Sequence, residues 1–139
     1  MRKNTAYGYA FLLALTLLFT SAAAANNSIQ ASQYIRNYSA SITAKSGGEI
    51  AIDGSVTGTG IMDTIGVKTL NIQKYQSGAW STVRSFSDVY EYESAQADFY
   101  ATYQGVEGSQ YRAVITFYAA SGGGSDSRIL TTSSVTAKN

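Results

Sequence analysis

Residues 105–113 read GVEGSQYRA, and this stretch decides the fold. Two glycines stand three positions apart, and Tyr111 follows them, two residues before the small side chain of Ala113. Glycine adopts positive φ without steric cost, so Gly105 and Gly108 are expected to let the chain leave one strand and turn into the next.

The run that begins at Tyr111, residues 111–119, alternates between two faces, with Tyr111, Ala113, Ile115 and Phe117 on the inner one. A period of two residues is typical of a strand with one buried face. Similar runs recur along the chain at residues 38–45, 49–56, 66–75, 80–86, 88–94, 98–104 and 127–138. Turn-forming residues separate several of them, at residues 46–48, 58–64, 76–79, 93–98 and 121–126. No segment has apolar residues at helical spacing, so the sequence predicts an all-β chain: a single antiparallel β-sandwich of seven or eight strands.

The glycine turn followed by Tyr111 resembles the tyrosine corner of immunoglobulin-like and fibronectin-type sandwiches, and the likeness covers most of residues 34–137. It implies one immunoglobulin-like β-sandwich domain, in which the Tyr111 hydroxyl bonds to the backbone a few residues upstream. The chain departs from true immunoglobulin domains because it has no cysteine, and its one tryptophan follows a hairpin. We expect structural roles for Gly105, Gly108 and Tyr111, and also for Trp80, which stands beside the hairpin and should be at least partly buried against the core.

A second resemblance is to small exported proteins of Gram-positive bacteria. It rests on MDTIG at residues 62–66, on the hairpin from IQK at 72–74 to Trp80, and on YQGVEGSQYRA at 103–113 with the glycine-rich turn that follows. This likeness implies no activity.

The beginning of the chain has the order of a secretory signal peptide. Two basic residues precede a short apolar run at residues 10–19, which is too short to span a bilayer, and a string of alanines follows. Ala23 and Ala25 occupy the small-residue cleavage positions, so the mature chain is predicted to start at Asn26 and to be secreted, extracellular and free of membrane insertion. The predicted organisation is a signal peptide at 1–25, a flexible lead-in at 26–33 and the sandwich domain at 34–139.

Composition excludes several kinds of chemistry. The chain has no histidine and no cysteine, which rules out Ser-His-Asp and Cys-His catalysis and histidine-ligated metals. Ten basic and nine acidic residues leave the charge near zero, so nucleic acid is not an expected partner. A pair of carboxylates for glycoside hydrolysis is open in principle at residues 88–98, but charges on an edge strand usually face solvent and prevent strand pairing. We therefore expect no enzymatic activity and no cofactor.

Two surfaces are candidates for binding. Successive loops of a sandwich alternate between its two ends, so residues 58–64, 93–98 and 121–126 should share one end. That end would carry four carboxylates: Asp63, Glu93, Asp98 and Asp126. Calcium is a weak alternative there, at Asp63 and Asp126, because this ion takes oxygen ligands from flexible loops. The second candidate surface is a tyrosine-bearing sheet face, with Tyr90, Tyr92, Tyr100 and Tyr118, since aromatic rings outside the core can stack on sugars or anchor a protein.

The predicted function is a non-catalytic, secreted binding or adhesion module whose ligand is an extracellular glycan or protein. The alternative is a structural or self-associating cell-surface protein, in which the long final run adds to a neighbour's sheet edge. Protease inhibition of the chagasin type is a minor alternative, since residues 58–64 lack that family's Asn-Pro-Thr-Thr pattern.

Overall fold

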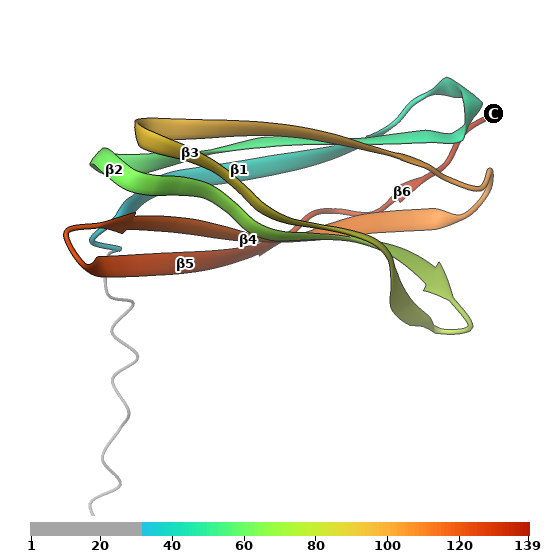
Figure 1. Ribbon diagram of the computed structural model, residues 1–139. Coiled ribbons are helices and arrows are strands. Elements are labelled where there is room, and N and C mark those ends of the chain that lie inside the picture. The colour runs from blue at the N-terminus through green and yellow to red at the C-terminus, as the bar shows by residue number, and fades with distance from the viewer. Residues whose placement is uncertain (1–31) are drawn as a thin grey trace, which may run out of the picture.

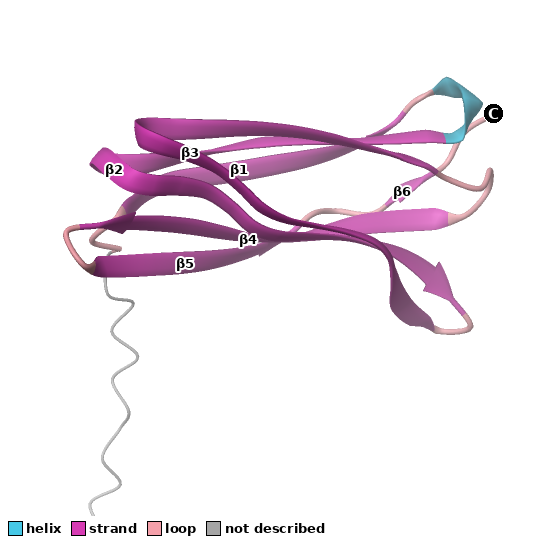
Figure 2. Cartoon of the chain, in the orientation of Figure 1, coloured by secondary structure: helices cyan, strands magenta, loops and turns pink. Residues whose placement is uncertain are grey.

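The computed structural model describes residues 32–139, which form a curled antiparallel sheet with almost no helix (Figures 1 and 2). The strands are β1 (Ile35–Ala44), β2 (Glu49–Gln76), β3 (Ala79–Gln104), β4 (Gln110–Ser121), β5 (Gly124–Thr131) and β6 (Val135–Thr136), and a short 3₁₀ turn, η1 (Ser46–Gly48), joins β1 to β2. None of the described residues forms a helix long and apolar enough to cross a membrane. The predicted signal peptide and most of the lead-in lie outside the described residues.

Two long strands, β2 and β3, run through both parts of the sheet. Residues 49–58 of β2 pair with β1 on one side and with residues 96–104 of β3 on the other, and we call this the three-strand part. Residues 62–76 of β2 pair with residues 79–94 of β3 and with β4, which in turn pairs with β5; this is the four-strand part. The order of pairing therefore places β2 in the middle of each part.

The predicted loops at 58–64 and 93–98 are instead bends inside continuous strands. The β2–β3 register shifts between Thr57 and Met62 and then resumes, so the ladder continues on both sides of the bend. Thr59 fastens the bend to the start of β1, because its backbone N–H donates to the Tyr34 carbonyl at 3.0 Å. Turn-forming composition correctly marked the change of direction, but the described chain has six strands rather than seven or eight.

The last predicted strand, residues 127–138, is also divided. β5 ends at Thr131, and β6 pairs with the beginning of β4 at Gln110 and Tyr111. Between them, the buried Thr132 side chain accepts a hydrogen bond from the Ala113 N–H at 2.9 Å. The Thr132 hydroxyl takes the place of a backbone partner for the Ala113 N–H, and this explains why β5 and β6 are separate strands.

The two parts of the sheet face each other across one apolar core. Phe117 of β4 lies 5.4 Å from Tyr38 of β1 and 6.0 Å from Phe99 of β3, measured between ring centroids. The four inward positions predicted for residues 111–119 are all fully buried. The core consists of Ile35, Ile42, Ala44, Ile50, Ile52, Val56, Met62, Ile65, Val67, Leu70, Ile72, Ala97, Tyr111, Ala113, Ile115, Phe117, Ala119 and Ala137.

Turns gather at the two ends of the molecule (Figure 1). The bends of β2 and β3 and the β4–β5 turn lie at the left, whereas η1, the β2–β3 hairpin and the β3–β4 connection lie at the right. The hairpin turn uses Ser77 and Gly78, with φ of 51° and 81°, as two-residue hairpins of this kind require. The distribution of connections between ends agrees with the sequence-based prediction.

The tyrosine that opened the sequence analysis is fully buried at the beginning of β4. Its hydroxyl accepts a hydrogen bond from the Val106 N–H, five residues upstream, at 2.8 Å. Gly108 has the expected positive φ of 80°. Gly105 does not: it is glycine because a Cβ there would lie 3.0 Å from both the Tyr111 ring and the Gly48 carbonyl oxygen. The prediction for Gly105 was therefore wrong in its reason, since close packing requires this residue.

Candidate functional site

The outer face of the four-strand part, which points away from the core, carries aromatic side chains that the core does not contain. Alternation along β4 sets this face, because Phe117 and Ala119 are buried and Tyr118 between them points outward. The β2–β3 and β2–β4 registers then place the remaining residues. We call this surface the aromatic face; its rings are Tyr75, Trp80, Tyr90, Tyr92 and Tyr118.

Three tyrosines form one group on this face, which we call the bend-end cluster. Tyr90 and Tyr118 flank Gly66 in the register, and their rings contact each other in a tilted arrangement with centroids 5.7 Å apart. The Lys68 ammonium lies 5.9 Å from the centre of the Tyr118 ring. Tyr92, two residues beyond Tyr90 on β3, is 67% exposed. The cluster thus combines two fixed rings with one open ring.

Gly66 provides the space in which this cluster is built. A Cβ at Gly66 would collide with the Val89 carbonyl oxygen and lie 2.9 Å from the Tyr90 Cα. Burial, followed by the neighbouring Asp88 carboxylate, raises the pKa of Tyr90 to about 12.

A second group, the hairpin-end cluster, lies beside the β2–β3 turn. Tyr75 pairs with Trp80 across the hairpin, and their ring centroids are 5.2 Å apart. The Arg112 guanidinium lies 4.4 Å from the centre of the indole and donates through Nε to the Gln73 side-chain oxygen at 2.8 Å. Trp80 is partly buried, as predicted, but it packs on the aromatic face rather than against the core.

Tyr100 is separated from the other predicted tyrosines. It pairs with Asp53 in the three-strand part, on the outer face of that part, and is 62% exposed. The Lys45 ammonium donates to its hydroxyl at 2.9 Å, and this bond is the main reason that the pKa of Lys45 is raised. Tyr100 and Tyr118 therefore lie on the outer faces of different parts of the sheet and do not form one site.

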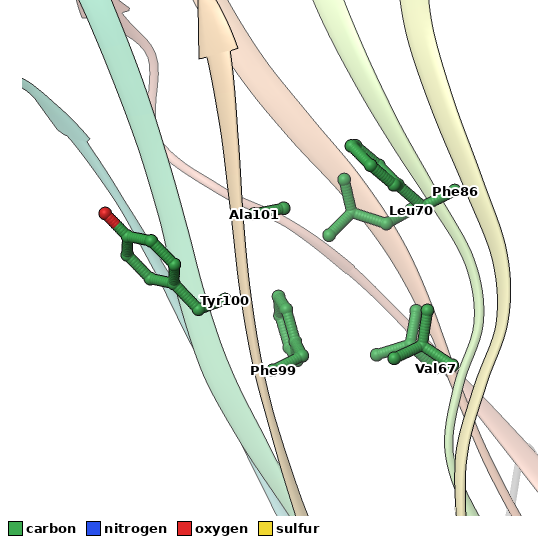
Figure 3. Close-up of a pocket in the computed structure, with 7 residues that line it drawn as sticks. Val67, Leu70, Phe86, Phe99, Tyr100 and Ala101 are labelled. Atoms are coloured by element: carbon green, nitrogen blue, oxygen red, sulfur yellow. The ribbon is translucent and has the colours of Figure 1, made fainter.

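A shallow apolar hollow of about 300 Å³, partly open to solvent, lies where the two halves of β3 face each other (Figure 3). The side chains that line it are hydrocarbon except for the Tyr100 hydroxyl, and the ring of Tyr100, at its rim, points away from the other side chains. The hollow exposes one flank of the core beside β3. The residues that line it are Val67, Leu70, Phe86, Val89, Phe99, Tyr100 and Ala101.

Two of the four predicted carboxylates are engaged by the protein's own groups. The Asp63 carboxylate accepts a hydrogen bond from the Gly122 N–H at 3.1 Å and so joins the β2 bend to the β4–β5 turn. The Asp126 carboxylate accepts hydrogen bonds from the Ser32 hydroxyl and, at 3.2 Å, from the Tyr34 N–H. The Ser32 bond is the main reason that the pKa of Asp126 is lowered. Both carboxylates fasten the turns of this end together.

The other two predicted carboxylates stand apart. Glu93 is exposed, with a φ of 50°, and Asp98 accepts a hydrogen bond from the Gln96 side chain at 2.9 Å. Within residues 32–139, no three Asp or Glu side chains lie close enough together to hold a metal ion. The weak calcium alternative therefore finds no support in the arrangement of these residues, because Asp63 and Asp126 accept hydrogen bonds from backbone N–H groups and Glu93 and Asp98 lie on separate stretches of β3.

The hairpin-end cluster was not recognised in the sequence. Its signal was present: Tyr75 and Trp80 flank the two-residue Ser77–Gly78 turn, and that turn makes them cross-strand partners. The position of Arg112 beside the indole could not be predicted from the sequence, because it depends on the β2–β4 register.

Comparison of the chain with protein-family models, curated proteins and solved structures finds no match. The candidate site therefore rests on the geometry of this molecule alone. That geometry favours the aromatic face over the carboxylate end, because its rings are outside the core, whereas Asp63 and Asp126 already accept hydrogen bonds from backbone N–H groups.

Proposed function

We propose that this protein is a non-catalytic, secreted binding or adhesion module, and that its ligand, an extracellular glycan or a protein, binds the aromatic face. The observation that carries the proposal is the presence of two ring clusters outside the core, held by Lys68, Arg112 and Gly66. Rigid rings offer a ligand large contact area at low cost in conformational entropy.

The proposal includes an immunoglobulin-like or fibronectin-type sandwich as the scaffold. Support comes from the strand pairing, in which one part has three strands, the other has four, and β2 is central in both. Further support comes from the bond between the Tyr111 hydroxyl and Val106, since a tyrosine corner is typical of such sandwiches. A sandwich of this kind would present each outer face on a rigid support.

The test is a glycan-array and cell-surface pull-down screen with purified residues 26–139. Any ligand found is then measured against Tyr92→Ala and against the double variant Asp63→Ala, Asp126→Ala. We expect Tyr92→Ala to weaken binding about tenfold and the double variant to bind normally after correction for its folded fraction. Loss of binding in the double variant alone would move the site to the carboxylate end, and a screen without any ligand would count against the binding module.

Self-association is the second candidate function, and one observation favours it. Within the described residues, β3 pairs only with β2, so one edge of this long strand is open beside the apolar hollow. An open edge can accept a strand from another molecule. Sedimentation over a wide concentration range tests this: a concentration-dependent increase in mass supports self-association, and a constant monomer mass opposes it.

A further inference from the structure

The open edge of β3 exposes part of the inner face of the sheet. Four side chains between residues 84 and 91 lie on that face, because each is paired with a core residue of β2; they are Arg84, Phe86, Val89 and Glu91. Val89 is 46% exposed, and both charged side chains are exposed. Phe86 and Val89 line the apolar hollow (Figure 3). The edge therefore presents two apolar side chains with a charge at each end.

The order of this row of side chains is symmetric about its centre. Asp88 has a φ of 57°, which interrupts the regular alternation, so Phe86 and Val89 face the same side although they are three positions apart. The row therefore reads charge, apolar, apolar, charge from either end, with a cation at one end and a carboxylate at the other. The Asp88 carboxylate does not belong to the row, because it lies near the Tyr90 hydroxyl, on the aromatic face.

The two end charges limit what can pair with this edge. The one ion pair among the described residues joins Lys45 to Glu49, so neither Arg84 nor Glu91 is paired within the chain. The Arg84 guanidinium lies 5.2 Å from the centre of the Phe86 ring, at the border of the apolar pair. Inward-pointing charges on an edge strand oppose pairing with most strands, because a charge left opposite an apolar residue or a like charge is costly. A strand that brings the opposite charge to each end avoids this cost.

The same strand of a second copy meets this condition. When two copies of β3 lie antiparallel about a two-fold axis at the centre of the row, Arg84 of each lies opposite the partner's Glu91. In the same register, Phe86 lies opposite the partner's Val89. Two-fold symmetry forms each contact twice, so all four charges are paired, and the apolar side chains of each copy cover the exposed side of the other's hollow.

We propose that the protein forms a two-fold dimer in which residues 82–93 of β3 pair, antiparallel, with the same residues of a second copy. This inference rests on self-association, the second candidate function, and deepens it, since it names the partner and the register. The two pairs of opposite charges set the register, and the contacts between Phe86 and Val89 exclude water from both hollows. The aromatic face points away from the core and stays free for a ligand, so the ligand screen and the dimer test have independent outcomes.

The test is sedimentation equilibrium of residues 26–139 with charge-reversal variants. Arg84→Glu and Glu91→Arg should each raise the Kd of the dimer at least about tenfold, because each places like charges opposite one another at both ends of the row. An equimolar mixture of the two variants should dimerise about as tightly as the wild type, since each cation then faces a carboxylate of the other variant. Glu107→Arg is the matched control: it makes the same charge change in the exposed β3–β4 connection and should leave the Kd unchanged.

Each result decides a different point. A constant monomer mass in the wild type would overturn both the dimer and self-association, and would leave ligand binding to the ligand screen. Association that neither reversal weakens, or that the mixture does not restore, would overturn this register while keeping self-association. Melting curves identify a reversal that unfolds the chain; the double variant Arg84→Glu, Glu91→Arg keeps one charge of each sign and must then dimerise like the wild type, and a monomeric, folded double variant would overturn the register.

Discussion

Single side-chain hydrogen bonds hold the segments that connect the strands, and the bond made by Tyr111 is the clearest example. Its ring lies in the core against Tyr103, and its hydroxyl reaches the backbone of the β3–β4 connection. One side chain thus joins the core to a turn. This role of Tyr111 was predictable from the sequence, because the tyrosine follows a glycine turn and begins an alternating run, as a tyrosine corner does.

We expect Tyr111→Phe to lower the free energy of unfolding by about 1 kcal/mol, because the Val106 N–H loses its partner while the ring packing stays. Tyr118→Phe is the control, since its hydroxyl makes no protein hydrogen bond within the described residues. Urea titrations measure both variants. Equal losses would refute a structural role for the Tyr111 hydroxyl.

The Asp126 carboxylate makes stability depend on pH in the acid range. Its pKa is lowered in the folded protein by the Ser32 hydroxyl, so its contribution is present above the unfolded value near 3.8 and is lost as pH falls through the lower folded value. Asp126→Asn should cost about 1 kcal/mol at neutral pH through the weakened bonds to Ser32 and Tyr34. Melting temperatures of the two proteins should converge below pH 4 or so; a constant difference down to pH 2 would contradict the mechanism.

At the level of strands, the main departure from the sequence prediction is continuity. Glycine and short polar residues at 58–64 are typical of a loop, and no local pattern distinguishes a loop from a bend that keeps its ladder. The distinction depends on β3, which follows β2 through the change of direction. Alternation within each run was reliable, since residues 111–119 bury the four predicted positions.

The candidate site was predictable to a lesser degree. Tyr90, Tyr92 and Tyr118 were recognised as residues outside the core, and they lie together. Tyr100 was assigned to the same surface, yet β3 crosses from one part of the sheet to the other between Tyr92 and Tyr100. Spacing along a strand cannot reveal such a crossing, so the separation required the structure.

A substitution at Gly66 tests whether the β2–β3 pairing depends on the space beneath Tyr90 and Tyr118. Gly66→Ala should lower the free energy of unfolding by roughly 2–4 kcal/mol, because the new methyl group meets the Val89 carbonyl and the Tyr90 backbone. Gly60→Ala is the matched control in the same strand, since a Cβ there meets nothing within 4 Å. Denaturant titration of both variants gives the comparison; similar stabilities would show that β3 shifts without cost.

For the molecule as a whole, the aromatic contacts across the core hold the two parts of the sheet together. Phe117 contributes to two of them, with Tyr38 and Phe99. Without cysteine, the chain has no disulfide to supplement these contacts. The closure of the curled sheet therefore depends on this packing together with hydrogen bonds such as those that the Asp126 carboxylate of β5 accepts from Ser32 and Tyr34 before β1.

Phe117→Leu should cost about 1–2 kcal/mol, because the smaller side chain loses ring contacts to both parts while the site stays apolar. Ile129→Ala, at a position 68% exposed on β5, should change stability by less than about 0.5 kcal/mol. Thermal unfolding followed by circular dichroism measures the two. An effect at Ile129 as large as that at Phe117 would show that the outer face contributes equally to stability.

The central position of β2 in both parts has a consequence for the order of events during folding. β1, β3 and β4 all take β2 as their partner, and of these three pairings only β2–β3 closes through a two-residue turn. The β4–β5 hairpin also has a two-residue turn but does not contain β2. Since short loops cost the least entropy to close, these two hairpins are expected to form before the other pairings, and the β2–β3 hairpin is then the template on which β1 and β4 assemble. Ile72→Val in β2 should then slow refolding, whereas Leu130→Ala in β5 should mainly accelerate unfolding, and stopped-flow measurements in urea distinguish these effects. Because β2 pairs with a neighbour on each side in both parts of the sheet, a substitution that weakens β2 is expected to slow the assembly of both parts.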